Sequence, residues 1–244
     1  MPESLPAEVL TADAFLAACR VEPDVFKLRS DYRTMLLVVD GLAPAATSAT
    51  SNDLVEAAEA HARRLLAERP VEELPHIAAW REAYRAFGAK SQRTRNSLEA
   101  LTRRAEQGLP RVNTLTDIYN AISVLHQVPL GGEDFYRYDG PARLVRSTGE
   151  EEFGTASGGE TVIEHPKPGE VIWRDKTGVT CRRWNWRQGR RTALTDKTSA
   201  AFFILDALAP MTDEALTATA DALADVLSGL GSAVTVSRRL IGAP

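Results

Sequence analysis

The sequence predicts an α+β fold, with helices concentrated in the first half of the chain and short strands in the second. Before Pro129, apolar residues recur at helical spacing in several segments, whereas beyond it short apolar segments alternate with glycines and prolines, as in an antiparallel meander. The composition agrees, because 44% hydrophobic and 25% charged residues in a chain of 244 are the proportions of a globular protein. We therefore expect one α+β unit with its own core.

The N-terminal half is expected to contain one strand and five helices. The apolar run from Met35 to Val39 is typical of a buried strand, which we place at residues 32–42. The helices are predicted from apolar periodicity and from the capping residues, glycines and prolines at their ends. They cover residues 11–20, 53–69, 77–87, 97–107 and 114–128.

The C-terminal half is expected to contain short strands and one long helix. The helix begins after a Thr212 cap, carries Asp213 and Glu214 in its first turn, and has a regular leucine and alanine stripe up to Leu230. Glycine- and proline-rich connections separate the strands. These are predicted at residues 143–146, 170–174, 179–184, 191–195, 202–208 and 233–237.

Charge is unevenly distributed along the chain. The whole chain has 29 basic and 33 acidic residues, a formal charge of −4, so contact with nucleic acid would require a local basic patch. Residues 174–191 contain seven basic residues and one acidic residue, whereas residues 206–225 contain five acidic residues and no basic one. The sequence therefore predicts a dipolar molecule.

The sequence lacks the motifs that are typical of several function classes. Cys19 and Cys181 are the two cysteines, which favours a reducing compartment over a disulfide scaffold or a zinc cluster. The four histidines have no metal-ligand spacing, and phosphate-loop, dinucleotide-binding and GxSxG motifs are lacking. No apolar run reaches the ~18 residues of a membrane span, and no secretory signal is visible. We expect a cytoplasmic protein without metal, cofactor or membrane contact.

A polar face on the helix predicted at residues 114–128 is the first candidate site. At about 100° per residue, Asn113, Asp117 and Asn120 lie within about 60° of one another, opposite the apolar positions. A carboxylate between two amides can orient an amine, a hydroxyl or a water. The alternative is a solvated helix face with Asn113 as its N-cap.

The second candidate site is the basic and aromatic segment 181–187. If it is a strand, its side chains alternate between two faces, Arg183, Asn185 and Arg187 on one and Arg182, Trp184 and Trp186 on the other. Arginines beside aromatic rings are suited to phosphate contact and base stacking. The alternative is a basic edge strand whose tryptophans anchor the core.

Gly131 and Gly132 follow the helix and form a third candidate. Paired glycines allow a ligand to approach the backbone closely, although Glu133 and Asp134 would repel a phosphate there. The alternative is that the pair ends the helix and forms a turn.

Four segments together resemble the B3/B4 domain, the tRNA-editing module of the bacterial phenylalanyl-tRNA synthetase β subunit. They are residues 80–88 (WREAYRAFG), 109–120 (LPRVNTLTDIYN), 129–134 (PLGGED) and 181–185 (CRRWN), and the resemblance covers residues 75–206. It implies a free-standing copy of the domain at residues 71–244, with residues 1–70 packed on it as a strand and helices in one structural unit. It further implies a mixed or antiparallel sheet sandwich with surrounding helices, and hydrolysis of the ester of wrongly charged tRNA.

The resemblance also implies where the pocket lies. Asn113, Asp117 and Asn120 match polar helix positions of the family. The sequence departs from the family at other pocket positions: Tyr119 stands in place of a threonine, Gly131 in place of a histidine, and Trp184-Asn185 in place of a glycine pair. The family carboxylate that reads a tyrosine hydroxyl falls on Asp206. The pocket position is thus retained, whereas its amino-acid specificity is not.

Three function hypotheses follow. In the first, the protein is a trans-acting aminoacyl-tRNA deacylase, in which Asp117 or Asp206 holds the α-ammonium and Asn120 and Asn185 orient the carbonyl and the water. Arg182, Arg183, Arg187 and Trp184 would contact the tRNA end, and a ribose hydroxyl would assist because no side chain is an obvious general base. The second is a non-catalytic module that binds tRNA or an amino-acid-like ligand. The third is a structural or partner-binding protein that uses its acidic C-terminal helix.

Overall fold

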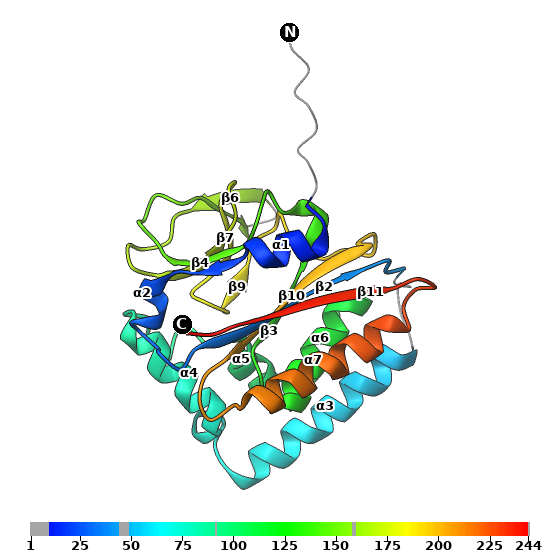
Figure 1. Ribbon diagram of the computed structural model, residues 1–244. Coiled ribbons are helices and arrows are strands. Elements are labelled where there is room, and N and C mark those ends of the chain that lie inside the picture. The colour runs from blue at the N-terminus through cyan, green and yellow to red at the C-terminus, as the bar shows by residue number, and fades with distance from the viewer. Residues whose placement is uncertain (1–9, 44–48, 91, 158–159, 244) are drawn as a thin grey trace.

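A computed structural model describes residues 10–43, 49–90, 92–157 and 160–243, and it confirms the α+β fold class (Figure 1). Over these residues the helices are α1 (Ala12–Ala18), α2 (Pro23–Phe26), α3 (Ala49–Glu68), α4 (Pro75–Ala86), α5 (Ser97–Arg104), α6 (Thr114–His126) and α7 (Asp213–Ser228). Short 3-10 helices lie at Val71–Glu73 and Phe135–Arg137.

The described strands form two larger sheets and a hairpin. The first sheet has the order β1 (Arg20–Val21), β4 (Arg143–Arg146), β7 (Val171–Arg174), β8 (Val179–Arg182), β9 (Arg187–Gln188). The second has the order β11 (Thr235–Ile241), β2 (Arg33–Asp40), β10 (Ala200–Ala207), β3 (Leu130–Asp134). The hairpin pairs β5 (Phe153–Ser157) with β6 (Glu160–Glu164). All pairs are antiparallel except β1 with β4, so the expected mixed and antiparallel pairing is present.

The two inner strands of the second sheet, β2 and β10, are buried on both faces. In β2, Leu36 and Val38 belong to one apolar cluster, whereas Leu37 and Val39 belong to another on the opposite face. This division follows from the two-residue period of a strand. It explains why the run from Met35 to Val39 is apolar without interruption.

The apolar cluster that contains Leu36 and Val38 fills the space between the two sheets. Trp173 of β7 and Phe202 of β10 belong to it, together with Trp80 of α4. Trp184, from the turn after β8, packs edge-on against Trp80 with ring centroids 5.3 Å apart. Such aromatic pairs contribute about 0.5–1.5 kcal/mol beyond the burial of their area.

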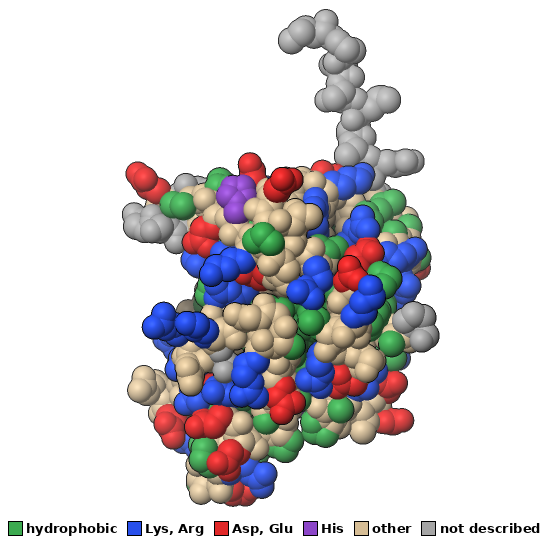
Figure 2. All heavy atoms as spheres, turned by 90° about the vertical axis from the view of Figure 1, so that its left-hand side faces the viewer, with side chains coloured by type: hydrophobic (Ala, Val, Ile, Leu, Met, Phe, Trp, Pro, Cys, Tyr) green, Lys and Arg blue, Asp and Glu red, His purple; other side chains and the backbone are tan. Residues whose placement is uncertain are grey.

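Helices cover the other face of the second sheet. Ile118 of α6 and Leu223 of α7 pack against this face, and α3 lies outside α6 (Figure 1). None of the described helices is long and apolar enough to cross a membrane. Figure 2 shows the side of the molecule on which α2 and α4 lie, where Lys and Arg side chains are numerous and acidic side chains lie between them.

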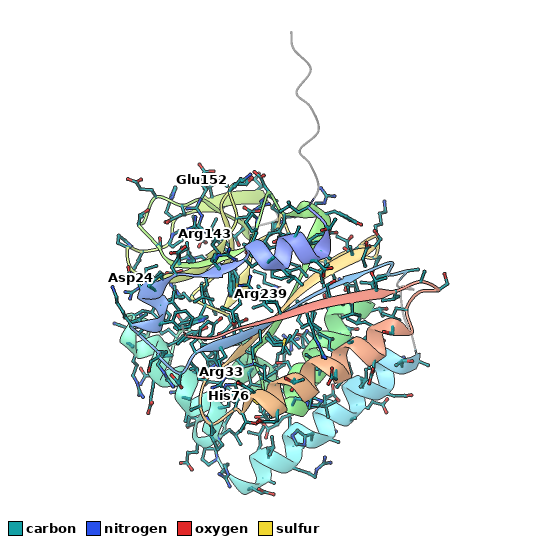
Figure 3. The ribbon with its side chains drawn as sticks, in the orientation of Figure 1. Asp24, Arg33, His76, Arg143, Glu152 and Arg239 are labelled. Atoms are coloured by element: carbon teal, nitrogen blue, oxygen red, sulfur yellow. The ribbon has the colours of Figure 1, made fainter. Side chains whose placement is uncertain are left out.

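His76 of α4 links this helix to two other segments of the chain through backbone contacts of its ring nitrogens (Figure 3). Its Nδ1 lies 2.8 Å from the carbonyl oxygen of Gln127, and its Nε2 accepts the backbone N–H of Leu208 at 3.1 Å. Burial lowers the pKa of His76 to about 4, so the ring is neutral at pH 7.

Three local predictions are wrong. The strand predicted at residues 179–184 ends at Arg182, because Arg183 and Trp184 adopt left-handed backbone angles with φ of 47° and 67°. Residues 191–195 form a turn with one isolated bridge, between Ala193 and Glu133, instead of a strand. Gly131 and Gly132 lie inside β3, so they do not form the turn that ends the helix.

The acidic C-terminal run is divided between two environments. Asp206 is buried on β10. Asp213 of α7 pairs with Arg33 at 2.7 Å, and Asp221 pairs with Arg238 of β11. The helix surface is therefore less acidic than the sequence indicated.

Candidate functional site

A cavity of about 240 Å³ opens at the end of the sheet sandwich. It is bounded by α5, α6, β3, β10 and the turn between β8 and β9. Its apolar wall includes Leu101, Ile204, Trp173 and Trp184. Its polar lining consists of Asn120, Asn185, Gln188, Asp206, Arg187, Ser97 and the hydroxyl-bearing Tyr119. A mostly apolar cavity with a few converging polar groups is typical of a small-ligand site.

Asp206 supplies the buried carboxylate of this cavity. The Tyr32 hydroxyl donates to its Oδ1 at 2.6 Å, and the Asn185 amide donates to its Oδ2 at 3.2 Å. Asp206 is 2% exposed, and burial raises the pKa of its carboxyl to about 7 despite these two donors. Near neutral pH the group can therefore gain or lose a proton when a charged ligand approaches.

Asn185 is held by an unusual turn. Its Oδ1 accepts the Tyr84 hydroxyl at 2.9 Å, and its backbone carbonyl accepts the N–H of Ser97 at the start of α5 at 2.9 Å. The two left-handed residues before it, Arg183 and Trp184, place Trp184 in the core and Asn185 in the cavity lining. Left-handed non-glycine residues cost of order 1–3 kcal/mol each, and such strain clusters at functional sites.

Asn120, on α6, contributes an amide without a protein partner. Its side chain lines the cavity, is 8% exposed, and makes no hydrogen bond to any part of the chain that the structure describes. The neighbouring Tyr119 hydroxyl lies 3.4 Å from the Oε1 of Gln188, whose amide donates to the Gly132 carbonyl at 3.0 Å. Because the Asn120 amide lines the cavity and has no such partner, it is available to bond a ligand or a water there.

Asp117 and Asn113 lie outside this lining. Asp117 accepts the backbone N–H of Val112 and the side chain of Arg111, each at 2.9 Å. Asn113 caps α6 through the N–H of Thr116 at 2.9 Å and donates to the Leu194 carbonyl at 3.3 Å. These two side chains are buried with Asn120, so the interpretation as a solvated helix face is wrong.

The two glycines of β3 differ in their surroundings. Gly131 lines the cavity, and a Cβ there would lie 2.9 Å from the Nε2 of Gln188. At Gly132 a Cβ would lie 2.8 Å from the Phe203 ring and 2.9 Å from the Tyr119 ring. Gly132 is thus required for packing, whereas a side chain at Gly131 would displace the flexible end of Gln188.

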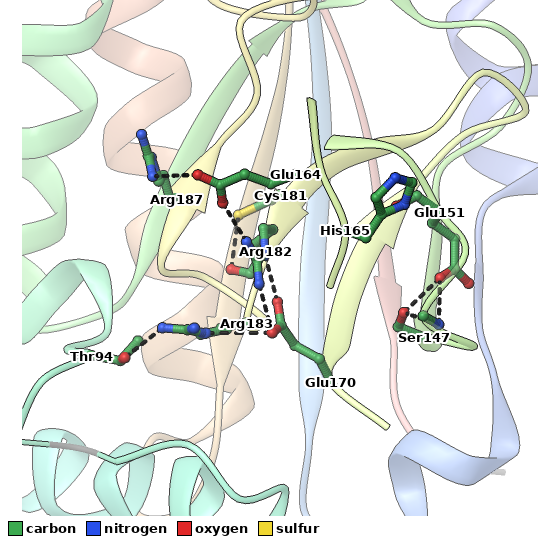
Figure 4. A network of polar contacts seen from close by, with 11 residues as sticks. Thr94, Ser147, Glu151, Glu164, His165, Glu170, Cys181, Arg182, Arg183 and Arg187 are labelled. Carbon is green, nitrogen blue, oxygen red and sulfur yellow. Dashed lines mark hydrogen bonds and ion pairs between the residues drawn. The ribbon is translucent and has the colours of Figure 1, made fainter. Parts of the chain in front are cut away.

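The arginine-rich segment has both buried and accessible members. Figure 4 shows their polar contacts. Arg182 is buried and bonds to Glu170 at 2.8 and 3.0 Å and to Glu164 at 2.6 Å. Arg183 is half-buried, pairs with Glu170 at 3.4 Å and donates to the Thr94 hydroxyl at 2.5 Å. Arg187 lines the cavity, and its guanidinium lies 3.9 Å from the carboxylate of Glu164. The Trp184 ring is fully buried, so in this conformation it offers no face to a nucleobase.

Sequence reasoning missed several residues of the cavity. Tyr32 and Tyr84 hold Asp206 and Asn185, and Gln188 and Trp173 line the wall. Gln188 lies next to the segment already singled out, so its position was a usable signal. Tyr32 lies 174 residues from Asp206 in the chain, and nothing in a single sequence indicates that contact. Among the described residues, no group of three or more His, Cys, Asp or Glu side chains is arranged to hold a metal ion.

Comparison with known families identifies the family of this domain. A sequence model of the B3/4 domain matches residues 79–225, which is more than half of the chain. The chain belongs to the B3/4 domain family. The resemblance seen in the four sequence segments is therefore confirmed, and the B3/4 match includes every residue of the cavity lining, whereas Tyr32 lies outside it.

Among solved structures, this B3/4 domain protein is similar to an N-terminal fragment of the phenylalanyl-tRNA synthetase β subunit from Pyrococcus horikoshii. The two share 11% sequence identity, with a TM-score of 0.46 over 88% of this chain and 49% of that one. The chain thus spans about half the length of that fragment. No curated protein sequence matches the chain.

Proposed function

We propose that this B3/4 domain protein is a trans-acting deacylase that hydrolyses the ester of misacylated aminoacyl-tRNA. The observation that carries the proposal is the partnerless Asn120 amide in the same cavity as the buried Asp206 carboxylate. An aminoacyl ester presents a carbonyl oxygen and an α-ammonium, which match an amide donor and a carboxylate.

Each polar side chain has a role in this proposal. Asp206 holds the α-ammonium, since it lines the cavity and Asp117 does not. The Asn120 amide donates to the ester carbonyl, and Asn185, already bonded to Asp206, keeps that carboxylate in place and orients the water. Arg187 at the cavity and Arg183 beside it meet the phosphates of the tRNA end.

The reaction needs a water, a carbonyl and a leaving ribose oxygen. Water attacks the ester carbonyl carbon, the bond from this carbon to the ribose oxygen breaks, and the water's proton passes to that oxygen. The cavity lining contains no histidine or lysine. A neighbouring ribose hydroxyl of the tRNA therefore assists the proton transfer in this proposal.

A panel of mischarged tRNAs tests the proposal. We expect the protein to release the amino acid from at least one of them above the buffer rate, and Asn120→Ala and Asp206→Asn to reduce that rate by 10-fold or more. Gln107→Ala, an exposed amide outside the cavity, is the matched control and should keep the wild-type rate. Buffer-level hydrolysis of every tRNA in the panel would contradict the proposal.

A non-catalytic module that binds tRNA or an amino-acid-like ligand is the second candidate function. The observation that favours it is that the lining has no histidine or lysine and that its carboxylate, Asp206, is assigned to the α-ammonium, so no other lining side chain is left as a general base. Binding of charged tRNA without turnover, abolished by Asn120→Ala, would support this candidate over the first.

A further inference from the structure

A second concave surface adjoins the cavity. It is an open groove of about 600 Å³ between the loop that follows α4 and the loop that precedes β7. The loop after α4 contributes Lys90 and Arg93, the loop before β7 contributes Lys167, and the turn after β8 contributes Arg183. Four cationic side chains therefore line one groove.

Three of these cations are available to a ligand. Lys90, Arg93 and Lys167 are exposed, and none of them has an acidic partner within 4 Å among the residues that the structure describes. Glu170 is the acidic residue in the groove wall. Its carboxylate is already paired with Arg182 at 2.8 Å and with Arg183 at 3.4 Å, so it does little to neutralise the groove.

The groove and the cavity have different lining residues, but a contact between Arg183 and Trp186 joins their walls. The Arg183 guanidinium lies over the Trp186 ring, 4.2 Å from its centroid, and Trp186 lines the cavity. Arg183 also donates to Thr94 of the groove at 2.5 Å, and Ser97, three residues later, lines the cavity (Figure 4). A chain whose end occupies the cavity can therefore continue across Arg183 into the groove.

From this geometry we propose that the groove binds the phosphates of a single-stranded polynucleotide whose 3′ end occupies the cavity. The proposal rests on the proposed function, which places an aminoacyl ester of RNA in the cavity. Unpaired cations along a groove, next to an aromatic ring and an arginine, are what single-strand binding sites use. Because the whole chain is acidic, this local patch supplies the attraction.

Charge reversal in the groove tests the assignment. The probe is a fluorescein-labelled 12-nucleotide single-stranded RNA, followed by anisotropy at several salt concentrations. The variant combines Lys90→Glu, Arg93→Glu and Lys167→Glu. We expect at least 10-fold weaker binding, and a salt dependence whose log–log slope is smaller by about 2, since each lost phosphate contact contributes roughly 0.7.

A matched control removes the same charge elsewhere. Arg64, Arg69 and Lys197 are exposed, lie outside the groove and have no acidic partner within 4 Å in the described structure. Their combined reversal to Glu should leave RNA affinity within twofold of wild type, and thermal unfolding should show that both triple variants are folded. Equal losses in the two variants would overturn the groove assignment.

Further arms identify the ligand. Binding of tripolyphosphate as tight as that of the RNA would show a site for a free phosphate. Binding of polyglutamate tighter than that of the RNA would show a site for an acidic protein. Either result overturns the proposal. Hydrolysis of an aminoacyl-adenosine without phosphates should be equal in wild type and the groove variant. If neither protein releases the amino acid from any mischarged tRNA of the panel, the proposed function fails while the RNA result still decides the groove.

Discussion

At the scale of single residues, Asp206 determines how the cavity responds to pH. Burial raises the pKa of its carboxyl to about 7, so the group is mostly protonated at pH 5.5 and half ionised at pH 7. A substrate ammonium needs the ionised form. Affinity for an amine ligand should therefore increase with pH through this range.

The corresponding prediction uses a stable amide analogue, 3′-aminoacylamido-3′-deoxyadenosine. Its affinity should rise about 10-fold from pH 5.5 to pH 7, a window below the usual α-amino pKa of about 7.7–8.0. Asp206→Asn should weaken binding and flatten the profile, and an analogue without the amino group should bind independently of pH. Isothermal titration calorimetry measures all three, and a flat wild-type profile would remove Asp206 from the ammonium site.

At the scale of secondary structure elements, Asp117 stabilises the start of α6. It bonds to the Val112 N–H and to Arg111, residues that lead into the helix. The asparagine of Asp117→Asn retains an acceptor for Val112 but loses its charge. We expect the free energy of unfolding to fall by about 1 kcal/mol, because charge-assisted hydrogen bonds contribute about 1.5–3 kcal/mol and Arg111 is partly exposed.

Two measurements on one preparation decide between the roles of Asp117. Urea unfolding should show the loss of stability, and deacylation per folded molecule should equal that of wild type. Asp117→Ala, which removes both acceptors, should cost more than Asp117→Asn. A fully stable Asp117→Asn protein without activity would instead return Asp117 to the substrate site.

The sequence predicted the elements with long periodic patterns and also several short ones, among them α1, β4 and β7. Helices α3 to α7 and strands β2 and β10 combine clear apolar spacing with recognisable caps or apolar runs. The turn at Arg183 and Trp184 was missed because both residues take left-handed angles normally reserved for glycine, and burial of the Trp184 ring overrides that preference. Strand β3 was missed because its two glycines are typical of turns.

The candidate site was predictable only in part, for a physical reason. Asn120, Asn185 and Asp206 were singled out from local pattern and resemblance, and the structure places all three at one cavity. Their supporting partners Tyr32 and Tyr84 come from other elements. A cavity is a property of packing between distant segments, which a single sequence does not encode in any local pattern.

At the scale of the whole molecule, one segment of the first 70 residues, strand β2, is built into the second sheet. Strand β2 lies between β10 and β11, and its residues 35–39 are buried in the clusters on both faces of that sheet. Burying an aliphatic side chain contributes about 1.5–3 kcal/mol, so these five together are comparable to the total stability of about 5–15 kcal/mol of a typical domain. Tyr32, just before this strand, also holds the carboxylate of the cavity.

We therefore expect that residues 71–244 do not fold alone, although this fragment contains the whole family match. Without β2, strands β10 and β11 would each lose a neighbour and both apolar clusters would be open to water. Circular dichroism and thermal unfolding of the fragment should show no cooperative transition. Adding a peptide of residues 1–70 should restore the transition, whereas the same peptide with Leu37→Asp should not, because the aspartate would be buried without a partner. A cooperative melt of residues 71–244 by themselves would show that the remaining sheet closes without β2.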